Sequence, residues 1–172
     1  MRLLVLSDIH SQETLLHNVL RYELAKAPRP DFVLFLGDGL DAFDGLAYHG
    51  AFSSLALLGV RGNRDFFGSY NTPDLRDFTW GNTHIVMTHG HRFEVKSGLE
   101  RVAAYGAQNG ADLVLFGHTH VQKEIRFSVG DRVGEGTLEK PLVLFNPGSI
   151  TSGCYGVITL SADGIACEHK RI

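Results

Sequence analysis

Short apolar runs recur along the first two thirds of the chain, and each is long enough for one buried strand. We predict five strands from these runs, over Arg2–Leu6, Phe32–Leu36, Leu55–Val60, His84–Thr88 and Leu113–Phe116. Nearly continuous apolar runs are typical of strands that are covered on both faces, as in parallel sheets. This part of the chain therefore has the pattern of an α/β protein.

The segments between the apolar runs predict helices. Ser11–Lys26 carries leucine and valine at helical spacing on one face, and Asp41–Phe52 predicts a shorter helix. Ser97–Asn109 predicts another helix, which begins with a Ser-x-x-Glu capping box ending at Glu100 and closes at Gly110.

The remaining segments predict a loop and antiparallel strands. Phe66–Trp80 shows little periodicity and predicts a loop. Val121–Glu139 combines alternating apolar positions with a glycine-rich stretch, which favours a hairpin. Leu142–Phe145 predicts another strand, and Tyr155–Leu160 with Ile165–Lys170 predicts a closing hairpin. We expect a mainly parallel first sheet and a second sheet that contains antiparallel strands.

Composition limits the classes of function. The 172 residues predict a single domain over 1–172, with 44% hydrophobic and 20% charged residues, as in ordinary globular proteins. The net charge of −3 and the lack of a Lys/Arg run do not indicate a nucleic-acid-binding surface. No apolar stretch reaches the roughly 20 residues of a membrane span, and the N-terminal sequence does not indicate a signal peptide, so we expect a cytoplasmic protein. Cys154 and Cys167 favour small buried side chains over a disulfide.

A residue of a kind that binds metal ions follows each of the five apolar runs. These residues are Asp8 and His10, Asp38, Asn63, His89, and His118 with His120. Because the carboxyl ends of parallel strands share one edge of a sheet, we expect these side chains to converge there. Carboxylate, amide and imidazole groups at one point are typical of a hydrolytic metal centre.

Taken one by one, the carboxylate and amide motifs have two interpretations. Asp8 and His10 lie on the same side of an extended segment, yet Asp-x-His is also common in surface loops. Asp38 lies between two glycines that permit a sharp turn, and its two oxygens could bridge two cations. Asp41 fits either a group that orients a ligand or a helix cap. Asn63 follows a glycine as turn residues do, and its neutral oxygen also suits a hard cation.

The histidine pattern points more strongly to metal binding. Four of the nine histidines form two His-x-His pairs, each beside glycine and just after an apolar run. This placement favours metal ligation by His89, His118 and His120. His91 is interpreted as a group that contacts substrate or supports a ligand.

The ordered set of motifs resembles the calcineurin-like metallophosphoesterase superfamily. The motifs are Asp-x-His, Gly-Asp-x-x-Asp, Gly-Asn-x-Asp, His-Gly-His and Gly-His-x-His, and the resemblance spans essentially the whole chain. The short length, the segment Asn146-Pro147-Gly148-Ser149 and the closing hairpin are similar to the small bacterial and archaeal phosphodiesterases of the YfcE type.

This resemblance implies a fold, a cofactor and a ligand set. The implied fold is a four-layer αββα sandwich of two mixed sheets flanked by helices, classed as α/β or α+β. The implied cofactor is a pair of divalent transition-metal ions, with Mn²⁺ favoured and Fe²⁺, Ni²⁺ or Zn²⁺ also compatible. The implied ligands share Asp38 as a bridge: they are Asp8, His10 and His120 for one ion, and Asn63, His89 and His118 for the other.

The resemblance also implies a reaction. A hydroxide that bridges the two ions would attack the phosphorus of a small phosphate ester, with a phosphodiester favoured. Asp38 and Asn63 would then take part in catalysis as well as in metal binding. Because histidine ligands must be neutral, we expect activity to fall on acidification.

The chain departs from the family pattern after Asn63. Many relatives carry His at the next position, and small phosphodiesterases of this type often carry Cys, whereas this chain has Arg64. Arginine stays protonated and is no ordinary general acid, but it could clamp phosphate oxygens; alternatively it pairs with Asp65 and shapes the loop. Good leaving groups should therefore be cleaved more readily than alkyl esters.

Two nearby features could affect substrate choice. Of the aromatic residues after Asn63, we expect Phe66 to be a core residue, while Phe67 and Tyr70 could equally be core or stack on a base or aryl group. The hairpin over residues 124–139 looks longer than in compact relatives, so it could cover the cleft or extend a homo-oligomer interface.

Other functions remain compatible with the same fold. A non-catalytic scaffold for protein binding has the retromer subunit as precedent, but such proteins tend to lose ligands that this chain keeps. A phosphomonoesterase would use the same centre, whereas a nuclease is disfavoured because the sequence shows no basic groove.

Overall fold

Two five-stranded mixed sheets face each other and have helices on their outer faces. The structure, a computed structural model, describes residues 1–66 and 71–172. In the first sheet the strand order is β12 (Gly164–Arg171), β11 (Cys154–Ser161), β1 (Arg2–Leu6), β2 (Phe32–Phe35) and β3 (Leu57–Gly59). In the second sheet the order is β4 (Leu75–Trp80), β5 (Thr83–Thr88), β6 (Leu113–Leu115), β10 (Leu142–Pro147) and β7 (Gln122–Phe127).

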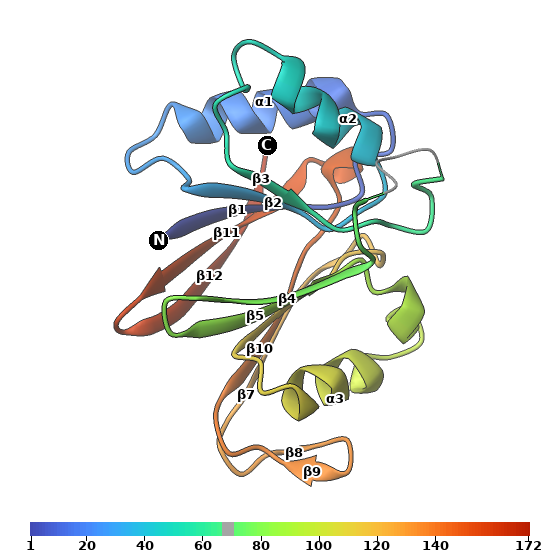
Figure 1. Ribbon diagram of the computed structural model, residues 1–172, viewed down its shortest axis with the longest axis vertical. Helices are drawn as coiled ribbons and strands as arrows, with labels where there is room; N and C mark the ends of the chain where they lie inside the picture. The colour runs from blue at the N-terminus through green and yellow to red at the C-terminus, as the bar shows by residue number, and fades with distance from the viewer. Residues whose placement is uncertain (67–70) are drawn as a thin grey trace.

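The outer layers are helical and complete the predicted αββα sandwich (Figure 1). Helices α1 (Glu13–Leu24) and α2 (Leu40–Gly45) cover the first sheet, and α3 (Glu100–Gln108) covers the second. Within residues 1–66 and 71–172 there are also three short 3₁₀ helices: η1 (Leu46–Tyr48), η2 (His91–Phe93) and η3 (Ile150–Ser152).

Alternation along β1 shows how the layers are held together. Leu4 and Leu6 belong to the core beneath α1, whereas Leu3 and Val5 belong to the core between the two sheets. All four side chains are fully buried. A strand with both faces covered needs apolar residues at every position, which explains the uninterrupted runs in the sequence.

The parallel strands are divided between the two sheets, which confirms the predicted pair of mixed sheets and corrects the expectation of a single shared sheet edge. In the first sheet β1, β2 and β3 are parallel, while β11 and β12 add antiparallel strands. In the second sheet β5, β6 and β10 are parallel, while β4 and β7 are antiparallel at its edges. The five apolar runs therefore end at two facing sheet edges and not at one.

Three local predictions were wrong, each for an identifiable reason. Leu75–Trp80 is a strand within the predicted loop; it lies at a sheet edge, where polar residues are tolerated on the outer face. Helix α3 has Leu99 as its N-cap and no side-chain cap, because Glu100 is already the first helical residue. The segment after residue 121 is no simple hairpin, since β7 pairs with β10.

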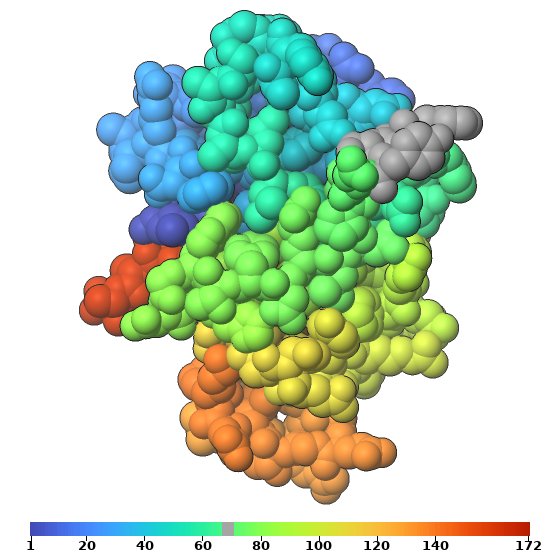
Figure 2. All heavy atoms as spheres, viewed as in Figure 1, coloured from blue at the N-terminus to red at the C-terminus, as the bar shows by residue number. Residues whose placement is uncertain are grey.

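The actual hairpin is short and lies away from the ligand-bearing loops. Strands β8 (Arg132–Val133) and β9 (Gly136–Thr137) pair with each other and project from the molecule (Figure 2). The hairpin packs on α3, where a Cβ on Gly134 would lie 2.9 Å from Cβ of Ala104. None of its residues lines the cavity beside the candidate ligands, so it does not cover that cleft.

Candidate metal centre

Loops at the ends of five strands bring the predicted ligands together. Asp8 follows β1, Asp38 follows β2 and Asn63 follows β3, all from the first sheet. His89 follows β5, and His118 with His120 follows β6, from the second sheet. The site therefore lies where the carboxyl ends of both parallel cores meet.

The first group of side chains consists of Asp8, His10 and His120. Their ligand atoms all lie within 4.8 Å of one another. Nε2 of His10 and Nε2 of His120 are 3.2 Å apart, and Oδ1 of Asp8 lies 3.0 Å from Nε2 of His120. Two imidazole nitrogens and a carboxylate oxygen thus face one point, as in a transition-metal site.

The two oxygens of Asp8 have different surroundings, which bear on whether a cation fits beside this carboxylate. Oδ2 accepts hydrogen bonds from the Ser7 hydroxyl at 2.6 Å and from the His118 backbone N–H at 3.1 Å. Oδ1 is buried and accepts no hydrogen bond from any described residue. Its nearest polar neighbours are the Nε2 atoms of His120 at 3.0 Å and His10 at 3.6 Å. A buried carboxylate oxygen without a hydrogen bond is costly, so these surroundings fit a cation held by all three groups.

The second group consists of Asp38, His89 and His118. Their ligand atoms also lie within 4.8 Å of one another. Nε2 of His89 is 3.1 Å from Nδ1 of His118 and 3.1 Å from Oδ1 of Asn63. The side-chain oxygen of Asn63 therefore lies beside this group.

Asp38 belongs to the second group and also faces the first. Its Oδ2 is 3.8 Å from Nε2 of His10 in the first group and 3.5 Å from Nε2 of His89 in the second. Its Oδ1 accepts a hydrogen bond from the Arg64 backbone N–H at 2.8 Å. Oδ2 is consequently the oxygen that faces both groups.

The backbone fixes the tautomer of His89. This fully buried ring places Nδ1 2.7 Å from the carbonyl oxygen of Leu36, which can only accept a hydrogen bond. Nδ1 must therefore carry a proton, and the lone pair of Nε2 is available for a metal ion when that atom is deprotonated.

Asp38 and His89 each favour the charged form of the other, with Oδ2 of Asp38 3.5 Å from Nε2 of His89. Burial by itself would raise the pKa of Asp38, but hydrogen bonds from His89 and the Arg64 backbone, together with the charges of His89 and His10, outweigh it and lower the pKa to about 2. Burial would likewise lower the pKa of His89, but interaction with Asp38 and Asp8 raises it. Because a metal ligand must be deprotonated, binding of a cation at Nε2 of His89 releases any proton that this atom carries.

The surroundings of His118 and His91 favour the neutral imidazole. Burial, reinforced by His89 and Lys96, lowers the pKa of His118 to about 4. Burial and His89 also lower the pKa of His91, whose Nδ1 is buried without a hydrogen-bond partner among the described residues. Neutral His118 suits a metal ligand, while His91 lies next to the second group, with its ring centroid 5.4 Å from that of His89.

The loops that carry the ligands adopt an unusual backbone conformation. Of seven described non-glycine residues with positive φ, five are candidate ligands: Asp8, His10, Asp38, His118 and His120. This left-handed conformation costs roughly 1–2 kcal/mol for a residue with a Cβ. Such strain accumulates at functional sites, where the surrounding structure holds it in place.

Two glycines allow these loops to pack against each other. A Cβ on Gly62 would lie 2.2 Å from Oδ1 of Asp38, and a Cβ on Gly117 would lie 2.0 Å from the Ser7 hydroxyl oxygen and 3.1 Å from Oδ2 of Asp8. Both carboxylates thus depend on the absence of a side chain in a neighbouring loop.

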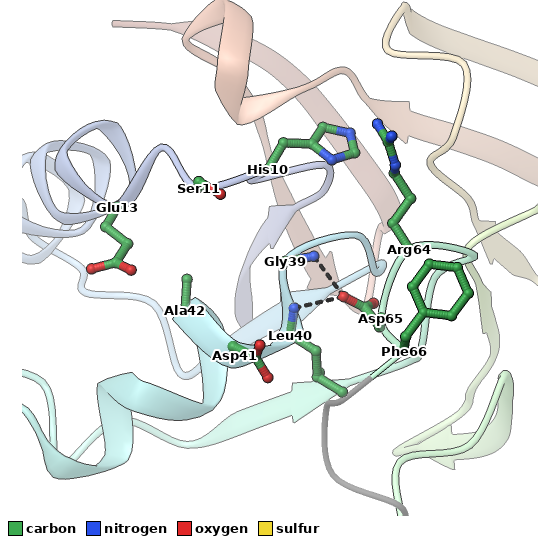
Figure 3. A pocket seen from close by; sticks show the side chains of 10 residues that line it. All are labelled: His10, Ser11, Glu13, Gly39, Leu40, Asp41, Ala42, Arg64, Asp65 and Phe66. Carbon is green, nitrogen blue, oxygen red and sulfur yellow. Dashed lines mark hydrogen bonds between the residues drawn. The ribbon is translucent and has the colours of Figure 1, made fainter.

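A cavity of about 520 Å³ opens beside the first group (Figure 3). His10, Arg64 and Phe66 lie on one side of it, and Glu13 and Asp41 lie on the other. The Phe66 side chain is 76% exposed, so its predicted place in the core was wrong; it extends from a loop end and not from a strand. Phe67 and Tyr70 lie outside the described residues.

Comparison with known proteins identifies the family. Residues 1–162 match the model of the calcineurin-like phosphoesterase superfamily domain. The chain belongs to this superfamily. It is 30% identical over 169 residues to the probable metallophosphoesterase YsnB of Bacillus subtilis (strain 168). The aligned residues cover 95% of this chain and 86% of YsnB.

Solved structures share the metallophosphoesterase fold. A predicted phosphoesterase from Streptococcus pneumoniae TIGR4 superposes with a TM-score of 0.69 at 21% identity, covering 99% of this chain and 88% of the other. Zinc-complexed Vps29 from Entamoeba histolytica gives 0.64 at 22% identity, with 99% of each chain covered. A novel archaeal phosphodiesterase gives 0.64 at 17% identity, with 100% of each chain covered.

The chain is thus a metallophosphoesterase by homology, with two candidate metal-binding groups. Within the described residues, no helix is long and apolar enough to cross a membrane. Cys154 and Cys167 are free and only partly buried.

One residue that organises this metallophosphoesterase site was not assigned from the sequence. Asp65 does not pair with Arg64; its carboxylate accepts hydrogen bonds from four backbone N–H groups. Asp41, considered as a cap, is exposed in the first turn of α2 and provides no side-chain cap. The only sequence signal for Asp65 was its place in the Gly-Asn-x-Asp motif.

Proposed function

We propose that this protein is a phosphodiesterase that depends on two divalent transition-metal ions, with Mn²⁺ favoured. The observation that carries the proposal is the position of Asp38 between two groups of ligands, beside a cavity of about 520 Å³. The superfamily contains phosphoesterases, and one structural neighbour is described as a phosphodiesterase.

The proposed ligand sets follow from the distances. Asp8, His10 and His120 would hold one ion, and Asn63, His89 and His118 the other, with Asp38 shared through Oδ2. When bound, two such ions lower the pKa of a water molecule and stabilise the charge that develops on phosphate oxygens.

The protein itself would position the ester. The Arg64 side chain projects at the cavity beside His10 (Figure 3), where its guanidinium could hold a phosphate oxygen with charge-assisted hydrogen bonds. His91 would support the second group, beside the ring of His89, or contact substrate. The cavity gives a diester's second substituent a place to lie, and the exposed ring of Phe66 would contact an aryl or base group.

A substrate comparison tests the proposed function. We expect metal-stripped protein to be inactive, and protein resupplied with Mn²⁺ to hydrolyse bis(4-nitrophenyl) phosphate with a higher kcat/KM than 4-nitrophenyl phosphate. A cyclic nucleotide extends the comparison to a leaving group that needs protonation, which we expect to react more slowly because Arg64 cannot donate a proton.

The same comparison distinguishes the other functions. Preference for the monoester would identify a phosphomonoesterase. Two bound ions without hydrolysis of any of these esters would favour a non-catalytic scaffold.

Arg64→Ala tests the phosphate clamp. We expect kcat/KM for the diester to fall by about 10-fold, since an exposed charge-assisted hydrogen bond is worth on the order of 1.5 kcal/mol. Metal content should not change, because the contact with Asp38 comes from the Arg64 backbone. Steady-state kinetics on both esters provide the measurement.

Arg101→Ala is the matched control for Arg64→Ala. Arg101 is an exposed residue of α3 that pairs with Glu94, and its loss should leave the kinetics unchanged. Unchanged KM and kcat in Arg64→Ala on both esters would remove Arg64 from the site.

A further inference from the structure

Asp65 joins the two loops that meet at the centre of the site. Its Oδ2 accepts the N–H groups of Asp38 at 2.8 Å and Gly62 at 2.7 Å. Its Oδ1 accepts the N–H groups of Gly39 at 2.7 Å and Leu40 at 2.9 Å (Figure 3). A carboxylate has about four lone-pair positions, so this side chain is fully engaged by backbone donors.

The loop held by Asp65 has an unusual backbone conformation. Gly37, Asp38 and Gly39 have φ angles of 93°, 64° and 133°, three consecutive residues in the left-handed region. Asp38 has a Cβ and therefore carries an intrinsic cost in this conformation. The hydrogen bonds to Asp65 stabilise this conformation and so oppose that cost.

The connection runs in both directions. Asp65 accepts the backbone N–H of Asp38, and Oδ1 of Asp38 accepts the backbone N–H of Arg64, the neighbour of Asp65. The orientation of the Asp38 carboxylate is thereby fixed at both ends, with Oδ2 left facing His10 and His89.

We infer that Asp65 is a positioning residue for the metal centre, which holds Asp38 where it contacts both ions and never binds an ion itself. The inference rests on the proposed function, because it assigns Asp65 a role toward the two ions. It extends that proposal to a residue whose two carboxylate oxygens are both occupied by backbone N–H donors.

Asp65→Asn is the direct test, because it preserves shape while removing acceptors. An amide group keeps one accepting oxygen, and its NH₂ would face two backbone N–H donors. We expect Mn²⁺ affinity, measured by calorimetry, to fall about 10- to 100-fold, the usual effect of disturbing a group that orients a metal ligand. Raising the Mn²⁺ concentration should restore most of the diesterase activity.

Asp112→Asn is the matched control. Asp112 accepts the His84 backbone N–H at 2.7 Å with one oxygen and pairs with Lys140 through the other. We expect Asp112→Asn to lower the melting temperature of the metal-free protein about as much as Asp65→Asn does. Unlike Asp65→Asn, it should not weaken Mn²⁺ binding. Equal Mn²⁺ affinity in Asp65→Asn and wild type would overturn the inference.

A measurement on the wild-type protein covers the case in which Asp65→Asn does not fold. In metal-free protein, the amide protons of Gly39 and Leu40 should exchange far more slowly than those of an exposed loop, because Asp65 accepts both. Exchange as fast as in the exposed β8–β9 turn would refute the role of Asp65. Wild-type protein that binds no Mn²⁺ would instead refute the proposed function, and this inference with it.

Discussion

Asp38→Asn is expected to abolish the shared metal site and to lower kcat/KM for a diester on the order of 10³-fold. Two ions contribute several kcal/mol of transition-state stabilisation, and each 1.36 kcal/mol corresponds to a factor of ten in rate. An amide fails here in either orientation. If the NH₂ group of the asparagine took the place of Oδ2, it would point at the ions, which it cannot bind. If the NH₂ group took the place of Oδ1, it would face the backbone N–H of Arg64, which is also a donor.

Metal content and hydrolysis should be measured on the same preparations of Asp38→Asn. Asp163→Asn is the matched control, since Asp163 is exposed in the turn between β11 and β12 and Asn-Gly suits such a turn equally well. This control should bind two ions and keep full activity. If Asp38→Asn retained both its ions and its activity, Asp38 could not bridge them.

Gly62→Ala is expected to displace Asp38 without altering any proposed ligand. The new Cβ would lie 2.2 Å from Oδ1 and 2.4 Å from the backbone nitrogen of Asp38, distances at which atoms overlap. Relieving the overlap should cost roughly 1–3 kcal/mol in the free energy of unfolding, as overpacking usually does. Because Asp38 moves, metal binding should weaken at both groups, which calorimetry would detect as a loss of tight Mn²⁺ binding.

Gly45→Ala separates the effect of position from that of adding a methyl group. Gly45 ends α2 with helical φ and ψ of −57° and −25°, and a Cβ there meets no atom within 4 Å. This variant should be more stable by about 0.4–1 kcal/mol, since alanine restricts the unfolded chain, and should bind Mn²⁺ normally. Normal metal binding by Gly62→Ala would show that its loop can move without disturbing Asp38.

Strand positions were predictable because both faces of the central strands are buried. The run before Asp8 matches β1 at both bounds, and the other four apolar runs each contain most of their strand. The edge strand Leu75–Trp80 was missed because its exposed face needs no apolar residue. Burial on both faces imposes a local pattern, whereas an edge strand is fixed mainly by its partner.

The candidate ligands were also predictable, for a different reason. Each follows an apolar run, and parallel pairing brings such positions to the end of a sheet. The exposure of Phe66 and the role of Asp65 were not predictable in this way. The environment of Phe66 depends on where its loop leaves the sheet, and the partners of Asp65 lie as far as 27 residues away in sequence.

The sequence by itself therefore determined the types of candidate ligand, their order and the family pattern that they resemble. These follow from short-range information, namely apolar runs that end in carboxylate, amide or imidazole groups. The tertiary structure decided that two sheets share the site, that Oδ2 of Asp38 faces both groups, and that Asp65 holds the loop behind it. Each of these depends on contacts between strand ends that are distant along the chain, which only packing of the two sheets brings together.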